Sequence, residues 1–195
     1  MGPSYRIPPC RGVCPPGRQI QHHAAVFLYL DQNYLSGIAK RKAGFRELEP
    51  VLREAVAAGA VRVPESEVHR IESRARPDLG LLELLRELSG GLRLPDDAGR
   101  AERRCARSLR AMLERDYPDR VPLASDDLDV VALSRALPHC RLVTCDAFMA
   151  ELIHRARLDT WCGCELFAGR RPDVENLRRR LEGLLRDGPA FDNAR

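Results

Sequence analysis

The stretch VFLYLDQNYLSG, residues 26–37, decides how the rest of the chain is interpreted. Its first five residues, 26–30, are apolar and largely aromatic or branched, which is typical of a short strand covered on both faces inside a parallel sheet. The apolar run stops at Asp31, and Asn33 offers a cap for a helix that begins at Tyr34. A carboxylate therefore stands where a strand gives way to a helix, which is the edge at which open α/β sheets bind ligands. Taken alone, such an acid is about as often a turn or capping residue.

Length and charge indicate one globular domain. The chain has 195 residues, of which 31% are charged, and a net charge of +4, which gives a mild preference for polyanions. Lys40 and Lys42 are the only lysines among 32 basic residues. Arginine suits phosphate recognition, but a GC-rich genome explains the same bias, so the enrichment by itself identifies no partner.

Cysteine usage and hydropathy predict a cytoplasmic protein that does not enter a membrane. The chain has seven cysteines and no apolar segment long enough for a signal core or a membrane span, which favours reduced thiols. Cys162 and Cys164 are spaced C-x-C, but no second pair stands at structural-zinc spacing. Zinc is therefore only weakly indicated.

The first third of the chain predicts a leader, two helices and a second strand. Residues 1–24 are rich in proline and poor in apolar side chains, so we expect a disordered leader. Helices are expected over residues 34–42 and 45–58, with Pro50 dividing the second, and a strand over residues 61–63.

Ser66 is expected to cap the next helix. Val68, Ile71 and Ala75 fall near helical spacing and would form its buried face. Glu72 lies at the border of that face.

Two more helices, residues 79–89 and 100–116, are expected to form a helical insertion over about residues 78–120. A run of arginines on a helix is usually a solvated face, and the alternative is a clamp for a phosphate backbone. The arginines that surround the apolar stripe of the second helix are Arg100, Arg103, Arg104, Arg107 and Arg110.

The segment SDDLDVVALSRALP, residues 125–138, predicts a helix with Ser125 as its cap. Asp126, Asp127 and Asp129 crowd its first turn. The helix dipole favours acids there and explains one or two of them, but three are more than capping requires.

A third strand is expected over residues 141–145, ended by Asp146 and followed by a helix. This repeats the arrangement of strand, carboxylate and helix at Asp31. Residues 160–164 suggest a short fourth strand, and residues 172–186 an amphipathic helix that packs on the body or receives a partner.

This alternation of strands and helices predicts an α/β fold with right-handed crossovers. We expect a single domain over residues 25–168, built as an α/β/α sandwich with a short central parallel sheet. Residues 169–195 would add the amphipathic helix and a tail.

The acids predict a reaction. Asp31 and Asp146 end different strands, and the ends of parallel strands share one edge, where Glu72, Asp126 and Asp129 could join them. Carboxylates in one cleft repel each other unless cations occupy the site. Mg²⁺ or Mn²⁺ suits all-oxygen ligands, and two such ions can hold a phosphodiester and activate a water. Metal-dependent phosphodiester hydrolysis is the reaction that these acids predict.

Four motifs together resemble a PIN-domain ribonuclease. They are the strand ending in LDQN, VPESEVHRIES at residues 63–73, SDDLDVVALSRALP, and LVTCD at residues 142–146. They stand in the family's order and cover roughly residues 26–167. The resemblance implies a PIN-like fold, a quartet of acids, bound Mg²⁺ or Mn²⁺ and cleavage of RNA.

The resemblance also assigns residues. Asp31, Glu72 and Asp146 match the first, second and last acids of the quartet. The third is open, because distance to Asp146 favours Asp129 whereas the S-D that opens the helix favours Asp126. The metal ligands implied are Asp31, Glu72, Asp129 and Asp146.

Three polar residues are expected beside the acids. Asn33, His69 and Thr144 would contact the substrate or orient carboxylates, although a lone histidine near a helix start is more often structural. Tyr34 and Trp161 could stack on bases, but we expect both in the core or at its rim.

The function implied is a metal-dependent endoribonuclease acting on single-stranded or structured RNA. A role as the toxin of a toxin and antitoxin module, an antitoxin-like partner and a homodimer are further expectations. One alternative is an inactive PIN-like module that binds RNA or protein, and another is an interaction protein that uses the C-terminal helix. A phosphotransfer protein with Asp31 as nucleophile is disfavoured, because the haloacid-dehalogenase type has a second acid where this chain has Asn33.

Overall fold

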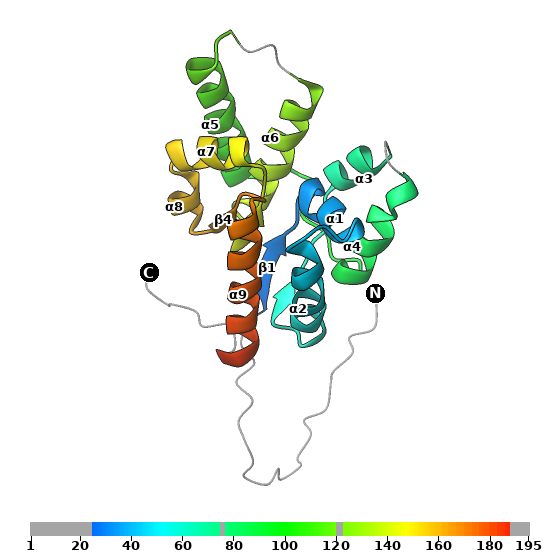
Figure 1. The fold of residues 1–195 in the computed structure, drawn as a ribbon. Coiled ribbons are helices and arrows are strands. Elements are labelled where there is room, and N and C mark those ends of the chain that lie inside the picture. Colours follow the sequence, from blue (N-terminus) through cyan, green and yellow to red (C-terminus); the bar gives the residue numbers. More distant parts are fainter. Residues whose placement is uncertain (1–24, 75–76, 120–122, 188–195) are drawn as a thin grey trace, which may run out of the picture.

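The computed structural model of the chain describes residues 25–74, 77–119 and 123–187. Within them, a four-stranded parallel sheet has the order β2-β1-β3-β4, and Figure 1 labels β1 and β4. The strands are β1 (Val26–Tyr29), β2 (Val61–Arg62), β3 (Leu142–Thr144) and β4 (Glu165–Phe167). The expected α/β class with a parallel sheet is confirmed.

The side chains of β1 enter two separate cores, because successive residues of a strand point to opposite faces. Leu28 and the following Leu30 belong to one hydrophobic cluster, and Tyr29 belongs to the other. On β3, Leu142 and Val143 divide in the same way. Both inner strands are therefore covered on both faces, as the apolar run of residues 26–30 predicts.

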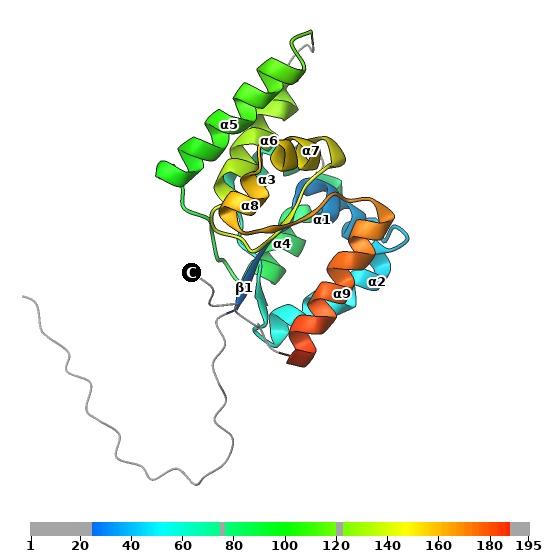
Figure 2. The same cartoon turned by 90° about the vertical axis from the view of Figure 1, so that its left-hand side faces the viewer.

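Helices cover each face of the sheet, an arrangement compatible with an α/β/α sandwich (Figures 1 and 2). One layer contains α1 (Gln32–Ala39), α2 (Phe45–Ala57), α4 (Leu81–Ser89) and α9 (Arg171–Asp187). The other contains α5 (Arg100–Asp116), α6 (Ala124–Ala136), α7 (Ala147–Arg155) and α8 (Leu158–Cys162).

The short helix α3 (Glu67–Ser73) contacts α1, α4 and α6, and a 3-10 turn at Pro77–Leu79 precedes α4. The expected insertion therefore contributes to both layers, since α4 packs in one core and α5 in the other. The ends of α5 and α6 that flank residues 120–122 project away from the sheet (Figures 1 and 2).

Two expectations about the first helices are wrong. Helix α1 begins at Gln32, because the carboxylate of Asp31, and not Asn33, caps it by accepting from the Tyr34 N–H at 3.0 Å. Pro50 lies inside α2 without dividing it. Leu48 and Leu52, on either side of Pro50, are both buried and hold the helix on one core.

Three other local expectations also fail. Helix α6 begins at Ala124 with Leu123 at the cap position, so Ser125 is not the cap. Ile71 is 41% exposed, because the buried face of α3 is built on Val68 and His69. The fourth strand lies later than residues 160–164, because α8 continues to Cys162 and Gly163, at φ 68°, ends it. The expected leader at residues 1–24 and Ala75 lie outside the described residues.

Helix α9 is part of the body. Its apolar stripe packs against α2 and β4 and is buried in the same core as Leu28 (Figure 2). This outcome was one of the two expected for the C-terminal helix. None of the helices in the described ranges is both long and apolar enough to cross a membrane.

Leu177→Ala should lower the free energy of unfolding by about 2–5 kcal/mol, because it leaves a cavity in this core. Leu177 is fully buried. The exposed Arg186, on the same helix, is the control, and Arg186→Ala should change stability by less than about 0.5 kcal/mol. Urea denaturation measures both, and equal effects would show that α9 is not packed as described.

Candidate active site

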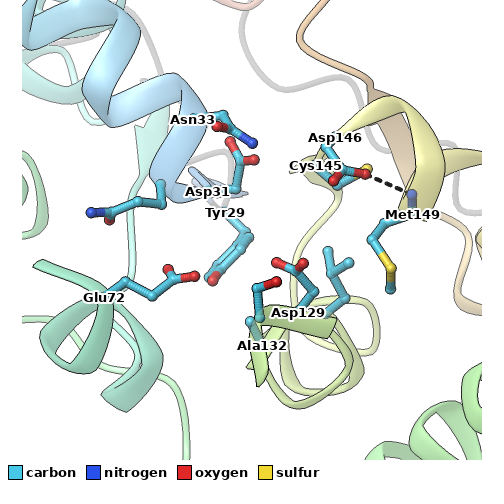
Figure 3. A pocket seen from close by; sticks show the side chains of 12 residues that line it. Tyr29, Asp31, Asn33, Glu72, Asp129, Ala132, Cys145, Asp146 and Met149 are labelled. Atoms are coloured by element: carbon cyan, nitrogen blue, oxygen red, sulfur yellow. Dashed lines mark hydrogen bonds between the residues drawn. The ribbon is translucent and has the colours of Figure 1, made fainter. Parts of the chain in front are cut away.

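A cleft opens at the carboxyl edge of the two central strands. Asp31 follows β1 and Asp146 follows β3, and these strands are paired in parallel with Leu28 opposite Leu142. Glu72 of α3 and Asp129 of α6 line the same cleft (Figure 3). The structure therefore brings together four of the five acids that the sequence singled out.

Asp31 is held by its own helix and by the neighbouring strand. Its Oδ1 accepts from the Tyr34 N–H at 3.0 Å and from the Thr144 hydroxyl at 3.1 Å. The same hydroxyl oxygen accepts from the Asp31 N–H at 2.7 Å. Thr144 is fully buried, so it orients Asp31 and does not reach a substrate. The prediction that Thr144 binds substrate is wrong. The alternative, that Thr144 orients a carboxylate, agrees with its hydrogen bond to Asp31.

Asp146 is fixed by the same local structure. Its Oδ1 accepts from the Met149 N–H at 2.7 Å and caps α7 (Figure 3). Its backbone angles, φ −78° and ψ 170°, nearly equal those of Asp31, φ −73° and ψ 169°. The sequence repeat of strand, carboxylate and helix is thus a repeat in three dimensions.

Glu72 and Asp129 reach the cleft from helices that do not need them as caps. Glu72 is the next-to-last residue of α3, and Asp129 lies in the second turn of α6. Figure 3 shows their carboxylates pointing toward the space in front of Asp31. Helix capping explains two of the four acids and leaves these two without a structural role.

Burial and mutual repulsion disfavour ionisation in the cleft. Desolvation raises the pKa of Asp31 to about 6, although hydrogen bonds from Tyr34, Thr144 and Asn33 oppose it. Desolvation first, and then the neighbouring carboxylates, raise the pKa values of Glu72 and Asp129 to about 7. No arginine, lysine or histidine is among the described residues that line this cleft, so no cationic side chain offsets its negative charge.

Asp126 lies outside this cleft. Its Oδ2 accepts from the Leu123 N–H at 3.0 Å at the start of α6, and Asp126 lines a different hollow beside Tyr117, the residue that follows α5. Between the two candidates for the third acid, the structure places Asp129 and not Asp126 beside Asp31.

His69 is a buried link between α3 and the end of β1. Its Nε2–H donates to the Leu30 carbonyl at 2.7 Å, and its Nδ1 accepts from the Ser66 N–H at 3.0 Å. The ring stacks on Tyr29 with 5.0 Å between centroids and is fully buried. His69 therefore cannot contact a substrate as the sequence suggested. It ties the helix of Glu72 to the strand of Asp31.

Asn33 is exposed at the rim of the cleft, where a role in substrate contact stays a prediction. Tyr34 packs on Phe45 in the core, as expected, and Trp161 is 39% exposed on α8. The sequence reading missed Tyr29, which lines the cleft beside Glu72 (Figure 3). Tyr29 lies between Leu28 and Leu30 at the end of β1, so its side chain points to the opposite face of the strand. This alternation is the sequence signal that could have identified it.

The side chains of the cleft have the ligand type that a hard divalent cation prefers, but they are too far apart to bind one. The four carboxylates and the Asn33 amide supply only oxygen ligands, which Mg²⁺ and Mn²⁺ prefer. Within the part of the chain that the structure describes, however, no three acidic, imidazole or thiol groups are close enough to hold a metal ion. Cation binding therefore requires carboxylates of the cleft to come closer together than they are in this structure.

Fold and site together define an α/β protein with an acidic cleft at the carboxyl edge of a parallel sheet. Comparisons with models of protein families, with curated proteins and with solved structures find no match to this chain.

Asp129→Asn should stabilise the cation-free protein at neutral pH. The raised pKa of Asp129 means that the folded state holds its proton more tightly than the unfolded chain does. The contribution of the protonated Asp129 to stability is therefore complete below about pH 4 and is lost as the pH rises through about 7. At pH 8 in EDTA, the free energy of unfolding of the variant should exceed that of the wild type by at least about 1 kcal/mol. This figure allows for solvent screening. Near pH 4 the two proteins should agree.

Asp127, which is exposed on the same helix, provides the control. Asp127→Asn should give no stabilisation, because it removes a favourable charge from the first turn of α6. Urea titrations at both pH values measure the effect, and a gain that is equal at pH 4 and pH 8 would contradict the prediction.

His69 should remain neutral, with its proton on Nε2, as the pH falls to about 5. Burial lowers its pKa from 6.5 to about 4, so its contribution to stability is intact above pH 6.5 and is lost as the pH falls through about 4. Imidazole ¹⁵N chemical shifts measure the tautomer directly. A ring that becomes protonated near pH 6.5 would show that the links to Leu30 and Ser66 are not formed.

Proposed function

We propose that the chain is a metal-dependent endoribonuclease with a PIN-like fold. The observation that carries the proposal is that Asp31, Glu72, Asp129 and Asp146, from four separate elements, line one cleft without a cationic side chain among them. The order of the acids along the chain, and the motifs that contain them, support the PIN-like assignment.

The four carboxylates would hold Mg²⁺ or Mn²⁺. A bound divalent cation of this kind polarises a phosphodiester and lowers the pKa of an attacking water. Thr144 and the N-terminus of α1 keep Asp31 pointing at the cleft, and the N-terminus of α7 does the same for Asp146. His69 fixes the distance between α3 and β1 and so keeps Glu72 opposite Asp31.

Asn33 is placed to contact the substrate from the rim. It is exposed, lies two residues after Asp31, and carries a neutral amide that can donate to a phosphate or a base. The neutral rim residue also favours hydrolysis over phosphotransfer through Asp31, for which a second acid at this position would be expected.

The proposal predicts that Asp31→Asn and Asp129→Asn each lower Mn²⁺-dependent cleavage of RNA at least about 100-fold, because each removes charge from the metal site. Asp126→Asn is the matched control. It lies three residues from Asp129 on the same helix, and asparagine can still accept from the Leu123 N–H, so activity should stay within a few-fold of wild type.

Cleavage of a 5′-labelled RNA, with and without EDTA, measures these effects. Activity that persists in EDTA or in Asp31→Asn would refute the proposal. RNA binding without cleavage by the manganese-loaded wild type would indicate an inactive binding module instead, and a stable phosphate on Asp31 would indicate phosphotransfer.

A further inference from the structure

Helix α5 presents an unbroken face of arginine. At about 100° per residue, five of its six arginines fall within an arc of about 120° on the helix, and these five are exposed. The sixth, Arg115, pairs with Asp116. The opposite side, built on Cys105, Leu109 and Met112, is buried against the rest of the protein. The residues of this arginine face are Arg100, Arg103, Arg104, Arg107 and Arg110.

Within the described ranges, none of these five guanidinium groups forms an ion pair with a carboxylate. Arg103 donates to the Ala98 carbonyl, and Arg104 lies over the ring of Trp161. Glu102, the acid nearest to them in sequence, is buried and bonded to His139 of another segment at 2.5 Å. The positive charge of the arginine face is therefore not neutralised by neighbours on its own helix.

The second arginine-rich helix behaves in the opposite way. On α9, Arg178 and Arg179 pair with Glu175, and Arg178 also pairs with Glu182. Arg180 pairs with Glu165 of β4 at 3.1 Å. A genome-wide preference for arginine acts on both helices alike, so it cannot explain why the five arginines of this face are unpaired while Arg178, Arg179 and Arg180 of α9 are paired.

Trp161 adds an aromatic surface to the arginine face. The guanidinium of Arg104 lies 4.3 Å from the centre of its ring, and 39% of Trp161 remains exposed. Stacking on the ring holds Arg104 in place, and a guanidinium plane or an indole can in turn stack on a nucleobase.

We propose that the arginine face of α5, together with Trp161, binds single-stranded RNA outside the acidic cleft. The choice of RNA as the polyanion rests on the proposed function. Ten residues of helix span about 15 Å, enough for the arginines to contact several consecutive phosphates of one RNA strand. A membrane surface fits less well, because the apolar side of α5 is buried and cannot enter a bilayer.

One helix, α6, connects the arginine face of α5 with the acidic cleft. Helix α5 packs along α6, which carries Asp129 into the cleft. An RNA strand bound on α5 must pass α6 to be cut in the cleft. RNA that is long enough to occupy both sites is therefore bound more tightly than RNA that occupies the cleft alone.

The test measures binding separately from cleavage. Both variants are made in full-length Asp31→Asn protein and assayed in EDTA, with a fluorescein-labelled 20-nucleotide oligouridylate as the probe. The first carries Arg100→Gln, Arg107→Gln and Arg110→Gln. The control carries Arg178→Gln, Arg179→Gln and Arg180→Gln, which removes the same charge from α9.

The α5 variant should bind about 100-fold more weakly at 0.1 M salt, and the slope of log K against log salt should fall by about 2, as expected for three lost phosphate contacts. The α9 variant should lose only a few-fold. Circular dichroism and the melting temperature confirm that both variants are folded.

Equal losses in the two variants, or an unchanged salt slope, would overturn the proposal, because either would show that overall charge and not this face governs binding. Binding of vesicles with anionic lipid but not of the oligouridylate would overturn it as well. Because no cleavage is measured, the RNA surface can fail while the nuclease proposal stands, and the reverse also holds.

Discussion

The parallel pairing of β1 with β3 is the constraint on which the site depends. With Leu28 opposite Leu142, the hydroxyl of Thr144 meets both the N–H and the carboxylate of Asp31, and Asp146 follows two residues later at the same edge. A slip of one residue would turn Thr144 to the other face of the sheet and place Leu142 in the wrong core. The register that buries the two cores therefore also fixes the two strand-end acids.

The cleft opposes stability while the rest of the fold supports it. Asp31 recovers part of the cost of ionisation by capping α1, and Asp146 caps α7. Glu72 recovers none in this way, because it lies near the C-terminus of α3, where the helix dipole disfavours an acid. Asp129 is raised in pKa by three other carboxylates as well as by burial. These two acids, which cost stability and cap nothing, are the physical reason for proposing a cation site.

Much of the fold was predictable, because apolar runs and the parallel-strand rule are local signals with a general consequence. These two signals were sufficient to predict β1 and to place Asp31 and Asp146 at the same edge of the sheet. The sequence offered both a substrate contact and a structural role for Thr144 and His69. It could not identify their partners, Asp31 and Leu30, because these are 113 and 39 residues away along the chain. The choice between Asp126 and Asp129 depends on where α6 begins. A start at Ala124 puts Asp126 in the first turn, bonded to the Leu123 N–H, and Asp129 in the cleft.

The two arginine-rich helices show why composition and structure carry different information. On α5, Arg100, Arg103, Arg107 and Arg110 follow each other at spacings of three and four residues, and like charges at these spacings destabilise a helix by about 0.2–0.5 kcal/mol per pair. On α9, the glutamates at Glu175 and Glu182 turn the same spacings into ion pairs. A chain that can neutralise arginines on one helix but leaves them unpaired on another accepts a repulsion on α5 that a polyanion would relieve. That relief, and not the abundance of arginine, is the physical argument for a binding surface.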